Sequence, residues 1–259
     1  MIMVNFLMVL SRNKTYLATV FCTLYKGEKF IKGYMENMIS QSVFNRVKFH
    51  ILDCNSPENE YETIERYLGY ENILYERLGE DPGLYEGWNI CCKRADTDLV
   101  GNWNVDDRKS PWSLEALIQP FLLDKNLDIS YGPTFVSEKA NENWEEVQKN
   151  VIFPCNETNR WEDLIINNNP HCMPIWKKSI HDRFGYFDSS YKTAADSDMW
   201  IRAVKQGAKI KMVRDVVGIY YQNPNGRSTD PETLKEMLEE VHGMRKKHYP
   251  NYQSKLHLF

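Results

Sequence analysis

The sequence predicts an α/β fold, in which helices flank a mostly parallel central sheet and a C-terminal helix follows. Three observations predict it: strand-like apolar runs alternate with segments of helical spacing, an Asp-Pro start signal opens a last helical segment, and no linker interrupts the 259 residues. With 42% hydrophobic and 13% aromatic residues, the composition excludes a disordered chain. The formal net charge of −4 lacks the basic excess of a nucleic-acid-binding protein.

In the first half, continuous runs rich in β-forming residues predict strands buried on both faces. These strands are expected at residues 16–24, 47–52, 73–76 and 99–103. Apolar residues at helical spacing predict a helix after each of the first three strands, at residues 28–40, 59–68 and 84–95. Strands that alternate with helices imply βαβ units, and ligands bind beyond the carboxyl ends of such strands.

The second half is less regular. We expect strands at residues 129–136, 172–176, 210–213 and 216–222. We expect helices at 111–123, 178–184 and 196–206, and a terminal helix from Asp230-Pro231 to about residue 248. Residues 141–161 are polar and carry few cues.

The compartment is inferred from the cysteines and the first residues. None of the six cysteines forms a CxxC pair or a zinc-like cluster, which favours reduced thiols in a cytoplasmic protein. Residues 1–10 are apolar, but they are too short to span a bilayer, and no basic residue or small-residue cleavage site marks a signal peptide. We therefore expect residues 1–15 to be an N-terminal extension without a transmembrane segment, and peripheral membrane contact stays open.

Asp106 and Asp107 are the most informative pair, because they follow the apolar strand at 99–103 directly. Two adjacent carboxylates repel each other, and a hard divalent ion that bridges phosphate oxygens would compensate them. The alternative is a solvated acidic loop. Asp53 ends the second strand at the same sheet edge, where it is a candidate for nucleotide recognition or a turn-forming residue.

A third acidic motif, Asp196-Ser197-Asp198, opens a predicted helix. A carboxylate at a helix start either caps the helix or serves as a general base toward a hydroxyl. His171, His242 and His248 are candidates for a third metal ligand, although a structural role is the commoner one for histidine.

Four segments, in this order, resemble the family 2 glycosyltransferases with the GT-A fold. ATVFCTLYKGEKFI at 18–31 is similar to that family's first strand and base-cupping loop, and ILDCNS at 51–56 to its second strand and acidic turn. DPGLYEGWN at 81–89 and NVDD at 104–107 resemble its Asp-x-Gly turn, helix and DxD-type motif. GYFDSSYKTAADSDMWIR at 185–202 resembles the region of the catalytic base.

The resemblance implies a GT-A-like single domain over residues 16–259. Within it, residues 16–107 would be the nucleotide-binding half, 108–230 the acceptor-binding half, and 231–259 the C-terminal helix and tail. It also implies transfer of one sugar, with inversion, from a nucleotide-diphosphate sugar, preferably a UDP-sugar. The acceptor would be the hydroxyl of a glycan, a lipid-linked molecule or a protein. A Mn²⁺ or Mg²⁺ ion would assist.

The same resemblance implies a role for each matching residue. Asp196 would be the catalytic base, Asp107 the metal ligand, and Asp106 a ribose contact beside the metal. The implied nucleotide-binding residues are Tyr25, Asp53, Asp81 and Asn89. In the loop at 223–229, Arg227 and Ser228 form a candidate lid over the diphosphate.

Three departures from the family pattern leave alternatives open. Lys26 stands where the family often has an Asn after the aromatic residue of the first loop, and Cys54 stands where it often has a second Asp, which leaves the base selectivity open. Ala195 stands where a Glu usually precedes the catalytic Asp. Decay at Ala195 would make the chain a non-catalytic sugar-nucleotide-binding protein. A sugar-phosphate nucleotidyltransferase would need a Gly-rich loop after the first strand, whereas residues 24–29 contain one Gly. The acidic balance argues against a metal-dependent nuclease.

Overall fold

The structure is a computed structural model that describes residues 16–226 and 229–253. Its main sheet has seven strands in the order β3-β2-β1-β4-β8-β6-β9. The strands are β1 (Ala18–Leu24), β2 (Val47–Asp53), β3 (Ile73–Arg77), β4 (Leu99–Asn102), β6 (Ile129–Tyr131), β8 (Ile175–Lys177) and β9 (Ile210–Met212). The first four strands pair in parallel, and β8 is antiparallel to both β4 and β6. The predicted α/β class with a mostly parallel sheet is confirmed.

A second sheet was not predicted. It has three strands in the order β5-β10-β7: β5 (Arg108–Lys109), β10 (Gly218–Tyr221) and β7 (Thr134–Ser137). The prediction of a single strand at 129–136 is therefore wrong. The strand ends before Gly132-Pro133, and the chain passes there from one sheet to the other. Pro133 has no amide to donate to a ladder. A Cβ on Gly132 would lie 2.7 Å from side-chain carbons of Val213 and Val217, so these side chains leave no room for a larger residue at position 132.

The helices follow the predicted order with two corrections. They are α1 (Glu28–Ile39), α2 (Tyr61–Ile64), α3 (Leu84–Arg94), α4 (Ser113–Leu123), α5 (Trp161–Ile166), α6 (Ile180–Phe184), α7 (Ala195–Lys205) and α8 (Pro231–His248). The helix expected at 59–68 is only one α turn, which continues as a 3₁₀ helix over Glu65–Tyr67. Helix α5 was missed because the polar stretch before it gives little periodicity.

The sheet separates two apolar layers. On β1, the side chains of Val20, Cys22 and Leu24 pack on one face, in the cluster that contains the buried residues of α1 and α4. The side chain of Phe21 points to the other face, in the cluster that contains the buried residues of α3 and α7. Both faces of β1 are therefore covered, which explains the continuous apolar run in its sequence.

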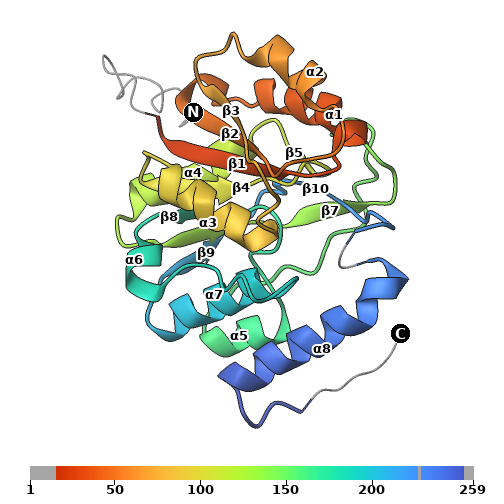
Figure 1. Ribbon diagram of the computed structural model, residues 1–259. Helices are drawn as coiled ribbons and strands as arrows, with labels where there is room; N and C mark the ends of the chain where they lie inside the picture. The colour runs from red at the N-terminus through yellow and green to blue at the C-terminus, as the bar shows by residue number, and fades with distance from the viewer. Residues whose placement is uncertain (1–15, 227–228, 254–259) are drawn as a thin grey trace.

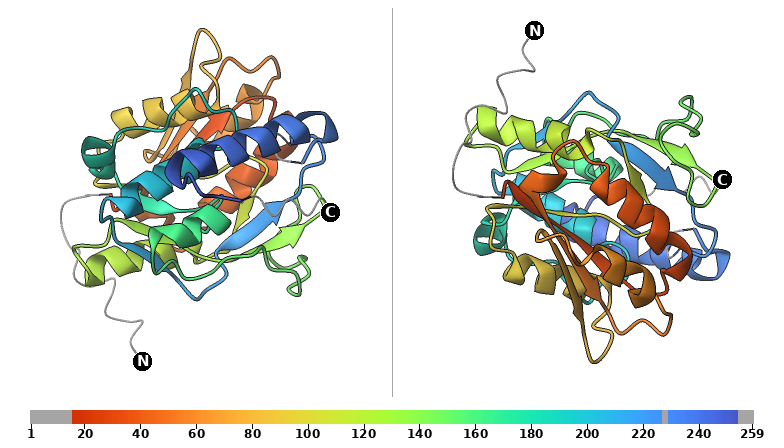
Figure 2. Two further views of the ribbon diagram at one scale, coloured as in Figure 1. Left: turned by 90° about the horizontal axis from the view of Figure 1, so that it is seen from below. Right: turned by 90° about the horizontal axis from the view of Figure 1, so that it is seen from above.

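The predicted C-terminal helix is confirmed as α8, which lies beside α5 and α7 in both figures (Figures 1 and 2). His248 Nε2 lies 2.8 Å from Asp198 Oδ1, and Arg202 Nε donates to Asp198 Oδ2 at 2.7 Å. The hydrogen bonds from these partners hold the pKa of the Asp198 carboxyl well below its usual range, against the effect of burial. Within the described residues, none of the helices combines the length and apolarity needed to cross a bilayer.

Candidate active site

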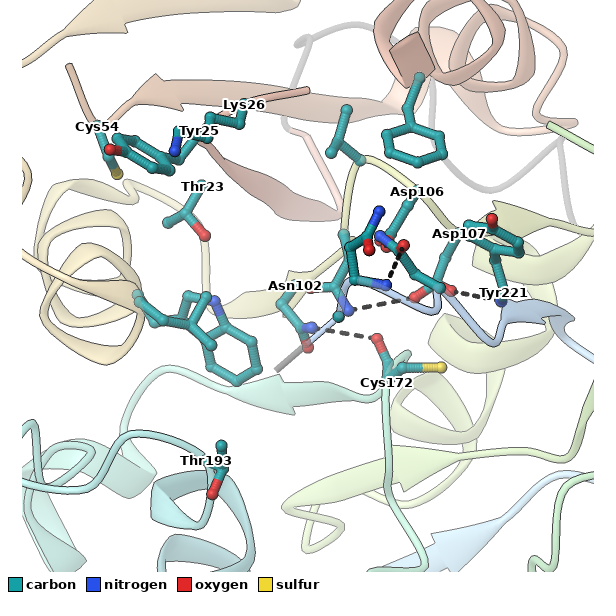
Figure 3. Close-up of a pocket in the computed structure, with 18 of the residues that line it drawn as sticks. Thr23, Tyr25, Lys26, Cys54, Asn102, Asp106, Asp107, Cys172, Thr193 and Tyr221 are labelled. Atoms are coloured by element: carbon teal, nitrogen blue, oxygen red, sulfur yellow. Dashed lines mark hydrogen bonds between the residues drawn. The ribbon is translucent and has the colours of Figure 1, made fainter. Parts of the chain in front are cut away.

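The carboxyl ends of β1, β2 and β4 open into one pocket of about 750 Å³ (Figure 3). This volume falls within the range of about 300–1,000 Å³ that small-molecule sites occupy. Tyr25 and Cys54, just beyond β1 and β2, line one side, and Asp106 and Asp107 follow β4. The pocket therefore lies where a parallel sheet is expected to bind its ligand.

The Asp106–Asp107 pair is held in the turn between β4 and β5 by groups distant in sequence. Asp107 is 1% exposed, and its Oδ1 accepts a hydrogen bond of 3.1 Å from the backbone N–H of Tyr221 in β10. Its Oδ2 accepts one of 3.2 Å from Asn104 Nδ2. Asp106 Oδ2 accepts one of 3.3 Å from Asn223 Nδ2, so the loop that follows β10 reaches the same pair (Figure 3).

Burial makes this pair costly to ionise without a cation. Burial and the neighbouring Asp106 raise the pKa of Asp107 well above its usual value. Burial also raises the pKa of Asp106. A divalent ion would offset both effects, and carboxylate oxygens are the ligands that Mg²⁺ and Mn²⁺ prefer. The two carboxylates therefore fit such an ion.

In the described part of the chain, no group of three or more His, Cys, Asp or Glu side chains is gathered to hold a metal. Of the three candidate histidines, His171 lines the pocket, but its ring stacks on Phe153 with centroids 3.8 Å apart. Burial lowers the pKa of His171 to about 4. His242 and His248 lie on α8, outside the lining. None of them completes a metal site with the aspartates.

Asp196 lies in the first turn of α7 and lines the same pocket. Its Oδ2 accepts a hydrogen bond of 2.7 Å from Asn168 Nδ2, and its Oδ1 accepts one of 3.1 Å from the Tyr85 hydroxyl. Burial raises the pKa of Asp196, against the effect of these donors. A carboxylate with a raised pKa and fixed orientation is suited to accept a proton from a hydroxyl.

Among the other predicted residues, Tyr25 and Asp81 line the pocket. Asp81 Oδ1 accepts a hydrogen bond of 2.8 Å from the backbone N–H of Gly83. Gly83 is the N-cap residue of α3, and its φ of 79° is a conformation that favours glycine. Arg227 and Ser228 lie outside the described residues, as does the extension at 1–15. The roles proposed for them stay predictions.

Asp53 and Asn89 are absent from the described lining of the pocket. Asp53 Oδ2 accepts hydrogen bonds from Arg77 at 2.5 Å and from the Tyr75 hydroxyl at 2.7 Å. The side chain of Asn89 exchanges two hydrogen bonds with the backbone of Phe187, at 2.9 and 3.0 Å. Asn89 thus ties α3 to the segment that leads into α7.

Sequence reasoning missed Tyr85 and Asn168, the two donors to Asp196. Tyr85 belongs to the segment at 81–89, but nothing in its spacing links it to a residue more than a hundred positions away. Asn168 stands in the run Asn167-Asn168-Asn169 before Pro170. Three consecutive amide side chains before a proline are an unusual loop, and that run could have been noticed as a polar cluster.

The profile described as "Glycosyl transferase family 2" matches residues 19–185. No curated protein matches this sequence at a significant level. Many solved structures do match in fold. They include S. aureus TarS residues 1–349 in complex with UDP-GlcNAc, at 16% identity and a TM-score of 0.70, over 92% of this chain and 68% of that one.

Two other solved structures set the scale of the likeness. TarS 1–349 alone gives a TM-score of 0.66 at 16% identity over 88% of this chain, and this chain spans 64% of its length. The Pyrobaculum calidifontis mannosyltransferase PcManGT, in complex with GDP-Man and Mn²⁺, gives 0.66 at 15% identity over 95% of this chain and 68% of that one. At these identities the likeness shows the fold alone, and the predicted GT-A-like fold is confirmed.

Proposed function

The chain belongs to glycosyl transferase family 2, and we propose that it moves a single sugar from a nucleoside-diphosphate sugar to an acceptor hydroxyl with inversion. One observation carries this proposal: Asp106, Asp107 and Asp196 come from distant parts of the chain and line one pocket. A metal-assisted leaving group and a general base are the two needs of such a transfer.

At the donor end, Asp107 and Asp106 would hold Mn²⁺ or Mg²⁺. The ion would supply positive charge for the departing diphosphate. The structure of PcManGT with GDP-Man and Mn²⁺ supports this assignment. Lys26 and Lys29 line the same pocket and add two positive charges to its wall, which favours an anionic ligand.

At the acceptor end, Asp196 would take the proton of the attacking hydroxyl. The hydroxyl oxygen forms a bond to the anomeric carbon as the bond between that carbon and the diphosphate oxygen breaks. The proton moves to the Asp196 carboxylate, which Tyr85 and Asn168 hold in place. One displacement inverts the anomeric carbon.

Ala195 does not weaken this assignment. It is fully buried, and it is not among the described lining residues. The Asp196 carboxylate lines the pocket with Ala195 before it. This retained carboxylate supports an enzyme over a sugar-nucleotide-binding protein without activity.

For the donor base we favour uracil. TarS structures with UDP and with UDP-GlcNAc support it, whereas PcManGT holds GDP-Man. Tyr25 lines the pocket, is 44% exposed and offers an aromatic ring to a base. The acceptor stays open among glycans, lipid-linked molecules and proteins. We keep the cytoplasm as the compartment, because all six cysteines are free thiols.

A thermal-shift panel of UDP, GDP, CDP and dTDP, with and without Mn²⁺, tests the donor site. A ligand at a hundred times its Kd stabilises by about 2.7 kcal/mol, or roughly 5–10 °C for a domain of this size. We expect that shift for UDP with Mn²⁺ and its loss in Asp107→Ala. The control is Asp98→Ala, an exposed residue beside the other end of β4, which should keep the full shift. No shift with any nucleotide would contradict the proposal.

A further inference from the structure

Glu240, on the terminal helix α8, binds the chain segment that leads to Asp196. Its Oε1 accepts hydrogen bonds from the backbone N–H groups of Thr193 at 2.7 Å and Ala194 at 2.8 Å, and from the Thr193 hydroxyl at 2.8 Å. Its Oε2 accepts one from the backbone N–H of Lys192 at 2.7 Å. One carboxylate thus accepts four hydrogen bonds from three consecutive residues.

The segment held in this way belongs to the pocket. Lys192 and Thr193 line it, and Thr193 is visible in Figure 3 apart from the aspartate pair. Ala194 is the N-cap residue of α7, and its side chain makes no cap. Asp196 is two residues further on. The placement of Asp196 in the pocket therefore depends on how this helix start is fixed.

Glu240 binds the chain immediately before α7. The amides that donate to it belong to the N-cap residue Ala194 and to the two residues before it. A negative charge close to the N-terminus of a helix is favourable. The carboxylate that supplies this charge comes from a helix 46 residues away in sequence.

The position of Glu240 is itself fixed, because α8 is anchored beyond it. Met244, one turn further along the same helix face, is 1% exposed in the core cluster of α7. At the end of α8, the backbone carbonyl of His248 accepts a hydrogen bond of 3.0 Å from Lys205 Nζ. With α8 tied to α7 at both points, the Glu240 carboxylate is a firm support for the segment between them.

We propose that Glu240 is a positioning residue for the catalytic base, acting through the segment at 192–194 to hold Asp196 in its reactive place. This inference rests on the proposed function. The hydrogen bonds of Glu240 go to residues 192–194 and not to any residue predicted to bind the nucleotide. Its loss should therefore lower turnover and leave nucleotide binding intact. A misplacement of about 1 Å in a reacting group can cost a hundredfold in rate.

The test variant is Glu240→Gln. Glutamine keeps the length of the side chain but replaces one acceptor oxygen with an NH₂ donor, which faces backbone donors. Glu240→Asp keeps both acceptor oxygens on a shorter stem and should have intermediate activity. The matched control is Glu239→Gln, the neighbouring residue, whose side chain is 70% exposed and pairs with Lys235.

Two measurements are combined. UDP release from UDP-GlcNAc with Mn²⁺, with water as acceptor, gives kcat and KM, and hydrogen exchange reports on the amides of 192–194. For Glu240→Gln we expect kcat to fall at least tenfold, KM to stay within twofold, and these amides to exchange faster. Glu239→Gln should match the wild type in all three.

Other outcomes overturn the inference. Faster exchange with unchanged kcat would make Glu240 a structural residue only, and unchanged exchange would show that the contact does not hold the segment in solution. A parallel rise in KM and fall in kcat would indicate general damage to the pocket. A wild-type chain that binds none of the nucleotides in the thermal-shift panel contradicts the proposed function itself, a result distinct from a failure confined to Glu240.

Discussion

The two halves of the chain build their parts of the pocket in different ways. In residues 16–107, four parallel strands lie side by side in one sheet, and seven consecutive residues of β1 pair with β2. In the described residues of 108–230, the six strands are two to four residues long and are divided between two sheets. The first half places its polar residues at strand ends by local rules, whereas the second half needs contacts across the fold.

Each half nevertheless supplies a hydrogen-bond donor to a pocket carboxylate of the other half, either Asp107 or Asp196. Asp107, at the end of the first half, accepts the N–H of Tyr221 from the second. Asp196, in the second half, accepts the hydroxyl of Tyr85 from the first. Neither half therefore holds a complete site. We infer that the two parts differ in how they are built but depend on each other in function.

The largest effect is expected for Asp196→Asn, which separates turnover from donor binding. A general base contributes about 10²–10⁴ in rate, so kcat should fall by that factor. UDP affinity should stay within twofold, because we assign Asp196 to the acceptor and not to the nucleotide. UDP release and calorimetric titration with UDP and Mn²⁺ measure the two quantities.

The control for that variant is Asp182→Asn, an exposed residue in the first turn of α6, which should keep full activity. An equally large loss of UDP affinity in Asp196→Asn would erase the distinction between a donor end and an acceptor end.

The contrast between the halves also explains what the sequence could predict. Buried parallel strands produce continuous apolar runs, so β1 to β4 and the aspartates at their ends follow from local patterns. The break at Gly132-Pro133 and the two-residue strand β5 carry no periodicity, and the second sheet was missed. The contact of Asn168 with Asp196 joins loops whose proximity only the packed fold determines.

The next effect concerns stability against pH, and it compares a buried histidine from each half. Burial lowers the pKa of His181, in the second half, to about 4, and its Nε2 accepts a hydrogen bond of 3.0 Å from Trp176 Nε1. Burial also lowers the pKa of His50, in the first half, but Glu76 at 3.3 Å opposes the shift. The stability contributed by neutral His181 is present above its unfolded pKa of about 6.5 and is lost as pH falls toward 4.

For this one group the unfolding free energy should fall by up to about 1.4 kcal/mol per pH unit within that window. His181→Gln keeps an acceptor for Trp176 and should flatten the slope, as measured by urea unfolding between pH 7 and pH 4.5. Asn126→Gln, an exposed substitution without a titratable group, serves as the control and should leave the slope unchanged. An unaltered slope in His181→Gln would contradict the assignment of acid sensitivity to the second half.

The smallest effect tests the joint between the halves. Gly101 in β4 pairs with Ile175 in β8, the antiparallel contact that joins the regular half of the sheet to the irregular one. A Cβ at Gly101 would meet the Ile175 side chain and lie 2.8 Å from the backbone carbonyl oxygen of Pro174. Because a backbone atom cannot move aside as a side chain can, Gly101→Ala should cost about 1–3 kcal/mol.

The form of the unfolding curve decides what that cost means. If the halves depend on each other, urea unfolding of Gly101→Ala should stay a single transition with an unchanged slope and a lower midpoint. Gly79→Ala is the matched control, since a Cβ there meets nothing within 4 Å, and its midpoint should stay close to that of the wild type. Two separate transitions in Gly101→Ala would mean that each half holds its own core. The hydrogen bonds from Tyr221 to Asp107 and from Tyr85 to Asp196 would then be contacts between independent units.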